Sequence, residues 1–317
     1  MGNGLNDILK NMISVILQGR IGNQLFIYAI AEQLRLLRGK DEDIYFYDYD
    51  IHKQNWVNSL EDYNLNNIHY IHHRFPYKLI PFFQYLVVKL FNRYCKGRSF
   101  MDKYHIETKY QPLLNWFGIM ICENGYVESS LVRNNHIMLY GFFQSPRYFE
   151  TYRNVIIEPL RLKKEIESLN LPLVKKIYNR NAVCISIKVE HNVGSSLYDV
   201  CCKEYWSEAI NYIISNVSNP LFFICSDNID YVINNLIDTT KFDFVSQDKD
   251  LPVHISLGIM SLCKHYIIGN TSFGWWAQAL CEYKDKIVVA PNPWMRVEMP
   301  VDIYEKGWHI IDVQKYF

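Results

Sequence analysis

The stretch ISVILQGRIGNQLFIYA (13–29) decides the fold. Its first five residues (13–17) form a largely aliphatic run that ends at a glycine turn, and residues 23–37 then carry apolar side chains at helical spacing. A second aliphatic and aromatic run follows at 44–47. A strand, a glycine turn, a helix and another strand make a βαβ unit, which is typical of a parallel α/β layer.

The same alternation returns in the C-terminal half. We expect strands at 182–187, 221–225, 242–245, 266–268 and 286–290, with helices at 203–215, 229–237, 251–263 and 273–280. Residues 52–136 show weak periodicity and are expected to form loops and helices, before a strand at 137–143 and helical segments from 146 to about 177. The sequence therefore predicts two α/β halves, 1–170 and 171–317, with ligands in a cleft at the carboxyl ends of their strands.

Composition limits the classes of function. The length of 317 residues fits about two domains of roughly 150 residues, and an apolar content of 49% excludes a disordered chain. Because 33 basic residues balance 33 acidic ones, no overall positive field would recruit nucleic acid. The eight cysteines include no CxxC pair and several lie in apolar runs, which predicts buried thiols in a reducing, cytoplasmic setting.

The glycine turn is the first candidate site. Gly19 and Gly22 flank Arg20, and the turn opens directly into a helix, where backbone amides and the helix dipole favour an anion or a sugar hydroxyl. The pattern differs from the dinucleotide motif GxGxxG, so the alternative is a turn with a structural role alone.

Three strand ends in the second half carry further candidates. Ser186 and Lys188 lie on one face of a strand that leaves through Glu190 and His191, although a solvated strand exit would look the same. Asp227 follows an apolar strand, where its carboxylate could accept hydrogen bonds from a ribose or a base edge, or cap the next helix. Finally, three small polar residues precede an aromatic helix and form either a second anion cradle or a helix cap: Asn270, Thr271 and Ser272.

Two motifs imitate metal sites. Asp48-Tyr49-Asp50 follows a strand and matches the DxD pattern, and His69, His72 and His73 form an HxxHH group. We expect neither to hold a metal, because the DxD pattern is common by chance and the histidine group has no fourth ligand. A basic and aromatic stretch at 74–98 is expected to be a core helix with solvated flanks, with a peripheral membrane contact as the alternative.

Several separated motifs resemble those of the α-1,2-fucosyltransferases, glycosyltransferase family 11. They occur in the family's order over about 13–294: GRIGNQLFIYA (19–29), LYGFFQSPRYF (139–149), FFICSDNIDYV (222–232), MSLCKHYIIGNTSFGWWAQAL (260–280) and KIVVAPNPW (286–294). The resemblance implies a GT-B fold of two Rossmann-like lobes, an acceptor-side N-terminal lobe and a GDP-sugar-binding C-terminal lobe. It also implies an inverting, metal-independent transfer of L-fucose from GDP-fucose, with no other cofactor, to the 2-hydroxyl of a galactose in an oligosaccharide.

The resemblance also implies roles for particular residues. Lys188 would contact the phosphates and Asp227 the guanosine, while Thr271, Ser272 and Phe273 would line the diphosphate. Asn23 would lie near the fucose and the acceptor. Gly19, Arg20, Gly22 and Ser186 complete the expected donor site.

One departure from the family pattern concerns the phosphate-binding cation. Where the family usually has His-x-Arg-Arg-Gly-Asp, residues 186–191 are SIKVEH, so Lys188 keeps the charge without the fork geometry of arginine. Glu190 or His191 stands where the family's aspartate would be, and both are candidates for the general base. The alternatives to an active fucosyltransferase are a silent nucleotide-sugar or glycan-binding homologue, and a transferase that uses another nucleotide sugar.

Overall fold

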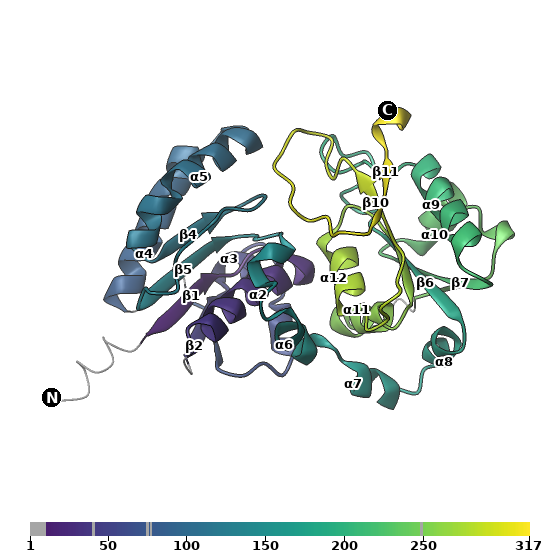
Figure 1. Ribbon diagram of the computed structural model, residues 1–317, viewed down its shortest axis with the longest axis horizontal. Coiled ribbons are helices and arrows are strands. Elements are labelled where there is room, and N and C mark those ends of the chain that lie inside the picture. The colour runs from purple at the N-terminus through teal and green to yellow at the C-terminus, as the bar shows by residue number, and fades with distance from the viewer. Residues whose placement is uncertain (1–10, 40–41, 74–75, 77, 248–249) are drawn as a thin grey trace. The chain divides into compact units, whose positions relative to one another are not determined.

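The computed structural model describes residues 11–39, 42–73, 76, 78–247 and 250–317. The chain divides into two compact units (Figure 1). Unit 1 takes the chain up to Pro159 together with Glu298–Ile303, and unit 2 comprises Leu160–Val297 and Tyr304–Phe317. The division falls earlier than the boundary of 170/171 expected from the sequence, and a short segment near the C-terminus belongs to unit 1.

Unit 1 contains a parallel sheet in the order β3-β2-β1-β5-β4. Its strands are β1 (Met12–Ile16), β2 (Asp43–Tyr47), β3 (Ile68–Ile71), β4 (Ile119–Cys122) and β5 (His136–Gly141). β1 is buried at every position, as expected of an inner strand covered on both faces. The strands predicted at 13–17, 44–47 and 137–143 are present. The expectation of only loops and helices at 52–136 is wrong, because β3 and β4 lie there.

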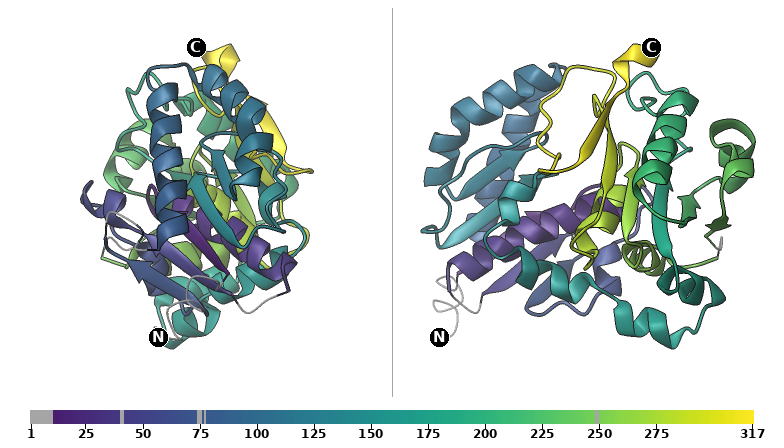
Figure 2. Two further views of the ribbon diagram at one scale, coloured as in Figure 1. Left: turned by 90° about the vertical axis from the view of Figure 1, so that its left-hand side faces the viewer. Right: turned by 45° about the vertical axis from the view of Figure 1, so that its right-hand side comes forward.

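Helices cover the unit 1 sheet. They are α2 (Ile21–Leu37), α3 (Tyr49–His52), α4 (Leu79–Cys95), α5 (Phe100–Trp116) and α6 (Arg153–Ile157), with 3-10 turns η1 (Ser59–Asp62), η2 (Pro146–Phe149) and η3 (Glu158–Leu160), the last ending in unit 2. α4 and α5 lie beside each other over one face of the sheet (Figure 2), where Tyr85, Val88 and Leu114 join a core cluster with Ile119 and Met138. The helix expected within 74–98 is therefore α4, while residues 74, 75 and 77 lie outside the described residues.

Unit 2 contains a second parallel sheet, in the order β11-β10-β9-β6-β7-β8. Its strands are β6 (Asn181–Ile187), β7 (Pro220–Ser226), β8 (Phe244–Ser246), β9 (His265–Ile268), β10 (Val288–Asn292) and β11 (His309–Asp312). Counted from β6, this is the strand order of the doubly wound dinucleotide-binding fold. β8 and β10 each begin two residues later than predicted, and β11 was not predicted.

The unit 2 sheet is flanked by helices on both sides. They are α7 (Lys163–Ser168), α8 (Pro172–Tyr178), α9 (Lys203–Asn216), α10 (Ile229–Tyr231), α11 (Val253–Ser261) and α12 (Ser272–Leu280), with short turns η4 (Val232–Leu236), η5 (Thr239–Lys241) and η6 (Gln314–Tyr316). The helix expected at 229–237 is one α turn that continues as the π turn η4. Tyr205 and Trp206 of α9 are fully buried against the sheet and anchor the unit 2 core.

All eight cysteines are free thiols. Six are buried, as the sequence predicts, whereas Cys201 and Cys202 are half-buried. Among the described residues, no helix combines the length and the apolar character that a membrane span would need.

Candidate active site

Predicted site residues of unit 2 meet where the order of its sheet reverses. This switch point lies between β6 and β9, and ligands of such sheets bind beside the carboxyl ends of the strands on either side of it. Lys188 follows β6, and residues 269–271 follow β9. A small cleft at this edge is lined by both segments and by Asn192 and Tyr198. The topology thus brings the residues at 186–191 and at 270–273 to one place.

Lys188 and Asp227 form an ion pair at the ends of the neighbouring strands β6 and β7. The Asp227 carboxylate also accepts hydrogen bonds from the backbone amides of Val189 (2.8 Å) and Glu190 (3.2 Å), and from the Ser226 hydroxyl at 3.4 Å. Asp227 therefore holds the exit of β6 in place. The family resemblance implies that Lys188 and Asp227 contact different parts of a nucleotide; in this structure, which holds no nucleotide, they contact each other.

α12 begins directly against the end of β6. Its N-cap Thr271 accepts a hydrogen bond from the Gly274 amide at 3.2 Å, so this residue caps the helix as the sequence allowed. A Cβ atom at Gly274 would lie 2.9 Å from the Ser186 hydroxyl oxygen, which explains why glycine occupies this position. The close packing fixes the helix start, with Ser272 and Phe273 in its first turn, at the edge that carries Lys188.

Asn270, which the sequence assigned to an anion cradle or a helix cap, ties the loop after β6 to the turn after β9. Its side-chain amide donates to the Tyr198 carbonyl oxygen (3.0 Å), and its side-chain oxygen accepts from Asn192 (3.3 Å). Asn270 is almost fully buried. Neither Asn192 nor Tyr198 gave a sequence signal, because both lie in an irregular loop without strand or helix periodicity.

Glu190 and His191, the two candidates for the general base, are exposed on the loop that leaves β6. Only the backbone of Glu190 is engaged by Asp227, so its carboxylate is not part of that contact. His191 has a φ of +67°, an uncommon conformation for a residue other than glycine. Among the cleft's other groups, burial of the Cys201 thiol raises its pKa above the ordinary range, which favours the protonated form.

The predicted residues Gly19, Arg20, Gly22 and Asn23 lie together in unit 1, where β1 leads into α2. Gly19 adopts a φ of +68°, and a Cβ atom there would approach the Asn23 side-chain nitrogen to 2.3 Å, so the turn requires glycine. The exposed Arg20 guanidinium lies 5.9 Å from the Trp56 ring centroid, and Gly22 is buried in the first turn of α2.

Gln24 and Gln144 support this turn, and sequence reasoning did not single out either. Gln144 follows β5, the neighbour of β1, and its side-chain nitrogen donates to the Asn23 side-chain oxygen at 2.7 Å. The fully buried Gln24 donates to the Gly19 carbonyl oxygen at 2.9 Å. The glycine turn is therefore held from two sides.

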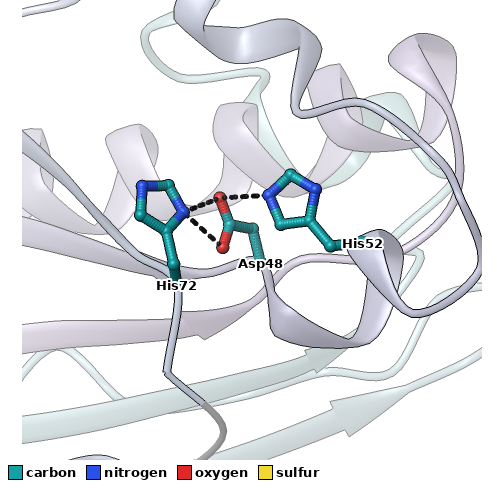
Figure 3. A group of neighbouring side chains, drawn as sticks. All are labelled: Asp48, His52 and His72. Carbon is teal, nitrogen blue, oxygen red and sulfur yellow. Dashed lines mark hydrogen bonds and ion pairs between the residues drawn. The ribbon is translucent and has the colours of Figure 1, made fainter.

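Neither metal-like motif forms a site as a unit. Asp50 pairs with Lys89 of α4 at 3.3 Å, whereas Asp48 contacts histidines, so the two DxD carboxylates have different partners. His69 pairs with Asp43 at 3.3 Å, while His72 contacts Asp48 at 3.0 Å. Asp48 instead joins His72 to a residue that neither motif includes, His52 (Figure 3).

Another cleft lies elsewhere in unit 1, with a volume of about 640 Å³. It is lined by Tyr28, Glu32 and Arg35 of α2 and by residues around Asn64 and Asn154, and it contains none of the predicted site residues. The Arg35 guanidinium donates to both Glu32 carboxylate oxygens, at 2.8 and 2.6 Å, and so is engaged within its own helix. Size alone therefore does not mark this cleft as the active site.

Comparisons with known proteins agree on the family. The model of glycosyl transferase family 11 matches residues 12–312. The O-antigen biosynthesis glycosyltransferase WbnK of Escherichia coli is 25% identical over 301 residues, which is 88% of this chain and 93% of WbnK. An alpha-1,2-colitosyltransferase of Escherichia coli is 24% identical over 295 residues, or 89% of this chain and 92% of that protein.

The comparison with solved structures agrees on the fold. The crystal structure of NodZ alpha-1,6-fucosyltransferase, co-crystallized with GDP, has a TM-score of 0.52 at 12% identity and covers 86% of this chain and 93% of its own. At that identity the likeness concerns the fold alone, and it confirms the predicted GT-B type with two Rossmann-like lobes. With the family model matching nearly the whole chain, the protein belongs to glycosyl transferase family 11, as its motifs predicted.

Proposed function

We propose that the protein is an inverting α-1,2-fucosyltransferase that transfers L-fucose from GDP-fucose to the 2-hydroxyl of a galactose in a glycan acceptor. Family membership and the family's order of motifs support this proposal. The observation that carries it is the grouping of Lys188, Asp227 and the start of α12 at the switch point of unit 2. This grouping offers a cation, a carboxylate and a helix N-terminus to a nucleoside diphosphate.

Donor binding requires Lys188 to exchange partners. Its ion pair with Asp227 is partly exposed, with side-chain exposures of 27% and 22%, and such pairs contribute at most about 1 kcal/mol. A diphosphate carries more negative charge than one carboxylate and would also interact with the α12 dipole, so the exchange is favourable. Asp227 stays anchored by the amides of Val189 and Glu190 and is then free to accept from the guanosine.

The same groups would serve the reaction. As the bond from fucose to phosphate breaks, negative charge grows on the leaving GDP, and Lys188 together with the amides at the start of α12 would stabilise it without a divalent cation. Glu190 or His191 would accept the proton of the attacking galactose hydroxyl. The positions of Asn23 and Arg20 in the reaction stay predictions, which Asn23→Ala and Arg20→Ala variants would test through KM for the acceptor and kcat.

The decisive experiment is an assay of the purified protein with GDP-fucose and lactose in the presence of EDTA, followed by linkage analysis of the product. We expect an α-1,2-fucosylated product and no loss of rate on adding EDTA. A requirement for Mn²⁺ or Mg²⁺ would contradict the metal-independent reaction. GDP binding without turnover on any galactose-containing acceptor would favour the silent homologue.

A second candidate is a transferase for another nucleotide sugar. One relative, 24% identical, is described as an alpha-1,2-colitosyltransferase, so the sugar can differ among relatives at this distance. A turnover assay distinguishes the two candidate functions: a panel of GDP-sugars and UDP-sugars is tested on the same acceptors. Turnover of a different sugar nucleotide, with GDP-fucose inert, would replace the fucosyltransferase assignment.

The proposal includes a cytoplasmic protein that binds the membrane surface through α4. Four apolar side chains follow one face of this helix and are 38–68% exposed: Leu79, Phe83, Leu86 and Leu90. Arg93 and Lys96 are exposed at the C-terminal end of the same helix. An apolar face beside cations is complementary to an anionic lipid surface, where a lipid-linked glycan acceptor would be found.

Sedimentation with phosphatidylglycerol-containing vesicles tests the membrane contact. Phe83→Asp with Leu90→Asp should abolish binding, because both changes place a negative charge on the apolar face of α4. Val155→Asp is the matched control, since Val155 is an exposed apolar residue on α6. Equal sedimentation of the two variants, or no binding by the wild type, would contradict this part of the proposal.

A further inference from the structure

Three side chains in unit 1 converge although no sequence motif contains all three (Figure 3). Asp48 follows β2, His52 ends the short helix α3, and His72 follows β3, the neighbour of β2. His72 Nδ1 lies 3.0 Å from each Asp48 carboxylate oxygen, and His52 Nε2 lies 3.3 Å from Asp48 Oδ2. One ligand atom from each residue falls within 4.8 Å of the other two.

We propose that Asp48, His52 and His72 bind a single Zn²⁺ ion. Zinc bonds to imidazole nitrogen and carboxylate oxygen are about 2.0–2.1 Å long, so neighbouring ligands of a tetrahedral ion lie about 3.3 Å apart. The nitrogen–oxygen distances of 3.0–3.3 Å match that spacing. Two imidazoles and one carboxylate also suit zinc, whereas Mg²⁺ and Ca²⁺ prefer oxygen ligands alone.

The burial of the three residues fits an ion that enters from solvent. The Asp48 side chain is fully buried, while the His52 and His72 side chains are 47% and 63% exposed. The carboxylate is thus fixed at the base of the site, and the exposed imidazoles can rotate to close around an ion. Three protein ligands leave a fourth position of the tetrahedron on the exposed side for water.

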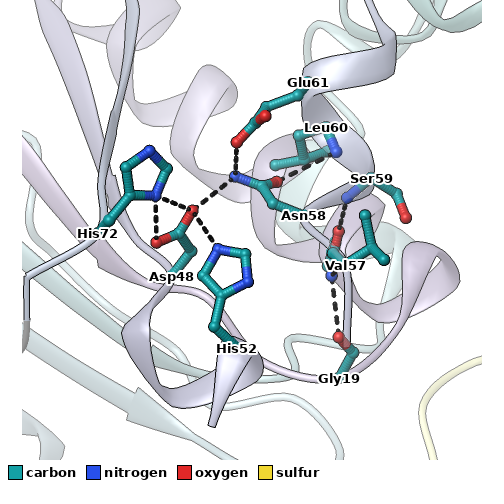
Figure 4. A network of polar contacts seen from close by, with 10 residues as sticks. Gly19, Asp48, His52, Val57, Asn58, Ser59, Leu60, Glu61 and His72 are labelled. Carbon is teal, nitrogen blue, oxygen red and sulfur yellow. Dashed lines mark hydrogen bonds and ion pairs between the residues drawn. The ribbon is translucent and has the colours of Figure 1, made fainter. Parts of the chain in front are cut away.

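A further residue orients the carboxylate. Asn58 donates from its side-chain nitrogen to Asp48 Oδ2 at 3.1 Å and to Glu61 Oε1 at 3.0 Å (Figure 4). Metal-binding carboxylates are commonly held by such hydrogen bonds. The carboxylate of Glu61 on the far side of Asn58 adds negative charge near the site, which favours a cation.

The site is one end of a polar network that reaches the glycine turn. Gln24 accepts from the Ser59 amide (2.8 Å) and donates to the carbonyl oxygens of Val57 and Gly19 (both 2.9 Å), so it joins the segment around Asn58 to the turn. A bound ion would tie the ends of β2 and β3 to this segment. The ion would act within unit 1 and would not replace Lys188 at the donor diphosphate, so it does not conflict with metal-independent transfer.

Titration calorimetry of the tag-free, EDTA-treated and desalted chain with ZnCl₂ tests the site. We expect one Zn²⁺ per chain, no heat with MgCl₂, and a loss of affinity of at least tenfold in His52→Ala and in His72→Ala. Asn58→Ala should weaken binding by about 10–100-fold, as loss of a supporting hydrogen bond does at other metal sites. His69→Ala is the matched control, because His69 lies on β3 and pairs with Asp43.

Two further readouts separate binding at this site from adventitious zinc. Co²⁺ should give the absorption of a nitrogen- and oxygen-ligated tetrahedral ion with the wild type and with His69→Ala, but not with His72→Ala. Zinc in hundredfold excess over its Kd should raise the thermal midpoint of the wild type and of His69→Ala only. No stoichiometric binding, or equal affinity in the His72→Ala and His69→Ala variants, would overturn the proposal and leave an Asp48–imidazole hydrogen-bond cluster.

Discussion

Replacing Lys188 with alanine should separate the stability of unit 2 from its affinity for GDP. The substitution removes the ion pair with Asp227, but the hydrogen bonds from the amides of Val189 and Glu190 to that carboxylate, 2.8 and 3.2 Å long, remain. Because the pair is partly exposed, its loss should lower the free energy of unfolding by no more than about 1 kcal/mol. The loop after β6 should therefore keep its place.

GDP affinity should fall much more than stability. If Lys188 binds the diphosphate, the variant loses a charge-assisted hydrogen bond of about 1.5–3 kcal/mol, which corresponds to a Kd roughly 10–150 times higher. The assay is calorimetric titration with GDP beside urea unfolding of the same preparations. Lys188→Arg is the control, and it should bind GDP at least as tightly as the wild type because its fork can contact a phosphate through two nitrogens. A folded Lys188→Ala variant with a GDP Kd within twofold of the wild type would show that Lys188 does not bind the diphosphate.

The remaining predictions concern the guanosine contact, the packing of α12 and one buried carboxyl group. Asp227→Asn should lower the affinity for GDP, because it removes the carboxylate that would accept from the guanosine, and should leave the affinity for pyrophosphate equal or higher, because it frees Lys188. Parallel losses of affinity for both ligands in calorimetry would contradict that role. Gly274→Ala should lower the free energy of unfolding by about 1 kcal/mol or more in urea, because overpacking against Ser186 outweighs the better helix propensity of alanine; an unchanged or higher stability would argue against the close contact. Burial, reinforced by Glu123, raises the pKa of Glu107 from 4.5 to about 8, so between those values the folded state holds a proton that the unfolded state has lost, and stability falls as pH rises. Glu107→Gln should remove this contribution, at most about 1.4 kcal/mol per pH unit, in urea unfolding at pH 5.5 and 8; identical pH dependence in both proteins would show that Glu107 does not cause it.

The strands that the sequence predicts well are those inside the sheets. β1 and β6 are continuous buried runs, because inner strands of a parallel sheet are covered on both faces. β3 and β11 lie at sheet edges, are only four residues long and are partly exposed, so their apolar pattern is too weak to recognise. β4 is fully buried, but it is only four residues long and follows the long helix α5. Periodicity cannot distinguish so short a strand from a continuation of that helix.

The sequence indicated which strand ends carry the candidate site, but not which of its side chains contact each other. Lys188, Asp227 and Thr271 were all placed at strand ends, and parallel topology brings such ends to one edge. That Lys188 pairs with Asp227 could not be predicted, because side-chain partners depend on the order of the strands, and the sequence does not state that β6 lies between β7 and β9.

The cluster in unit 1 shows the same limit of sequence reasoning. Asp48 belongs to the DxD pattern and His72 to the HxxHH group, but their partners in the structure lie outside their own motifs. His52 drew no attention because it lies outside both motifs. Asp48 and His52 share the single turn of α3 at i,i+4 spacing, but His72 follows β3 and reaches them only through the pairing of β2 with β3, which spacing along the chain does not reveal.

A crystal structure of the protein with GDP would show whether the nucleotide binds at the switch point of unit 2. We expect the diphosphate to contact Lys188 Nζ and the backbone amides at the start of α12, with Asp227 facing the guanosine. GDP in the unit 1 cleft beside Arg35, or on unit 2 with Lys188 still paired to Asp227 and away from the phosphates, would contradict it.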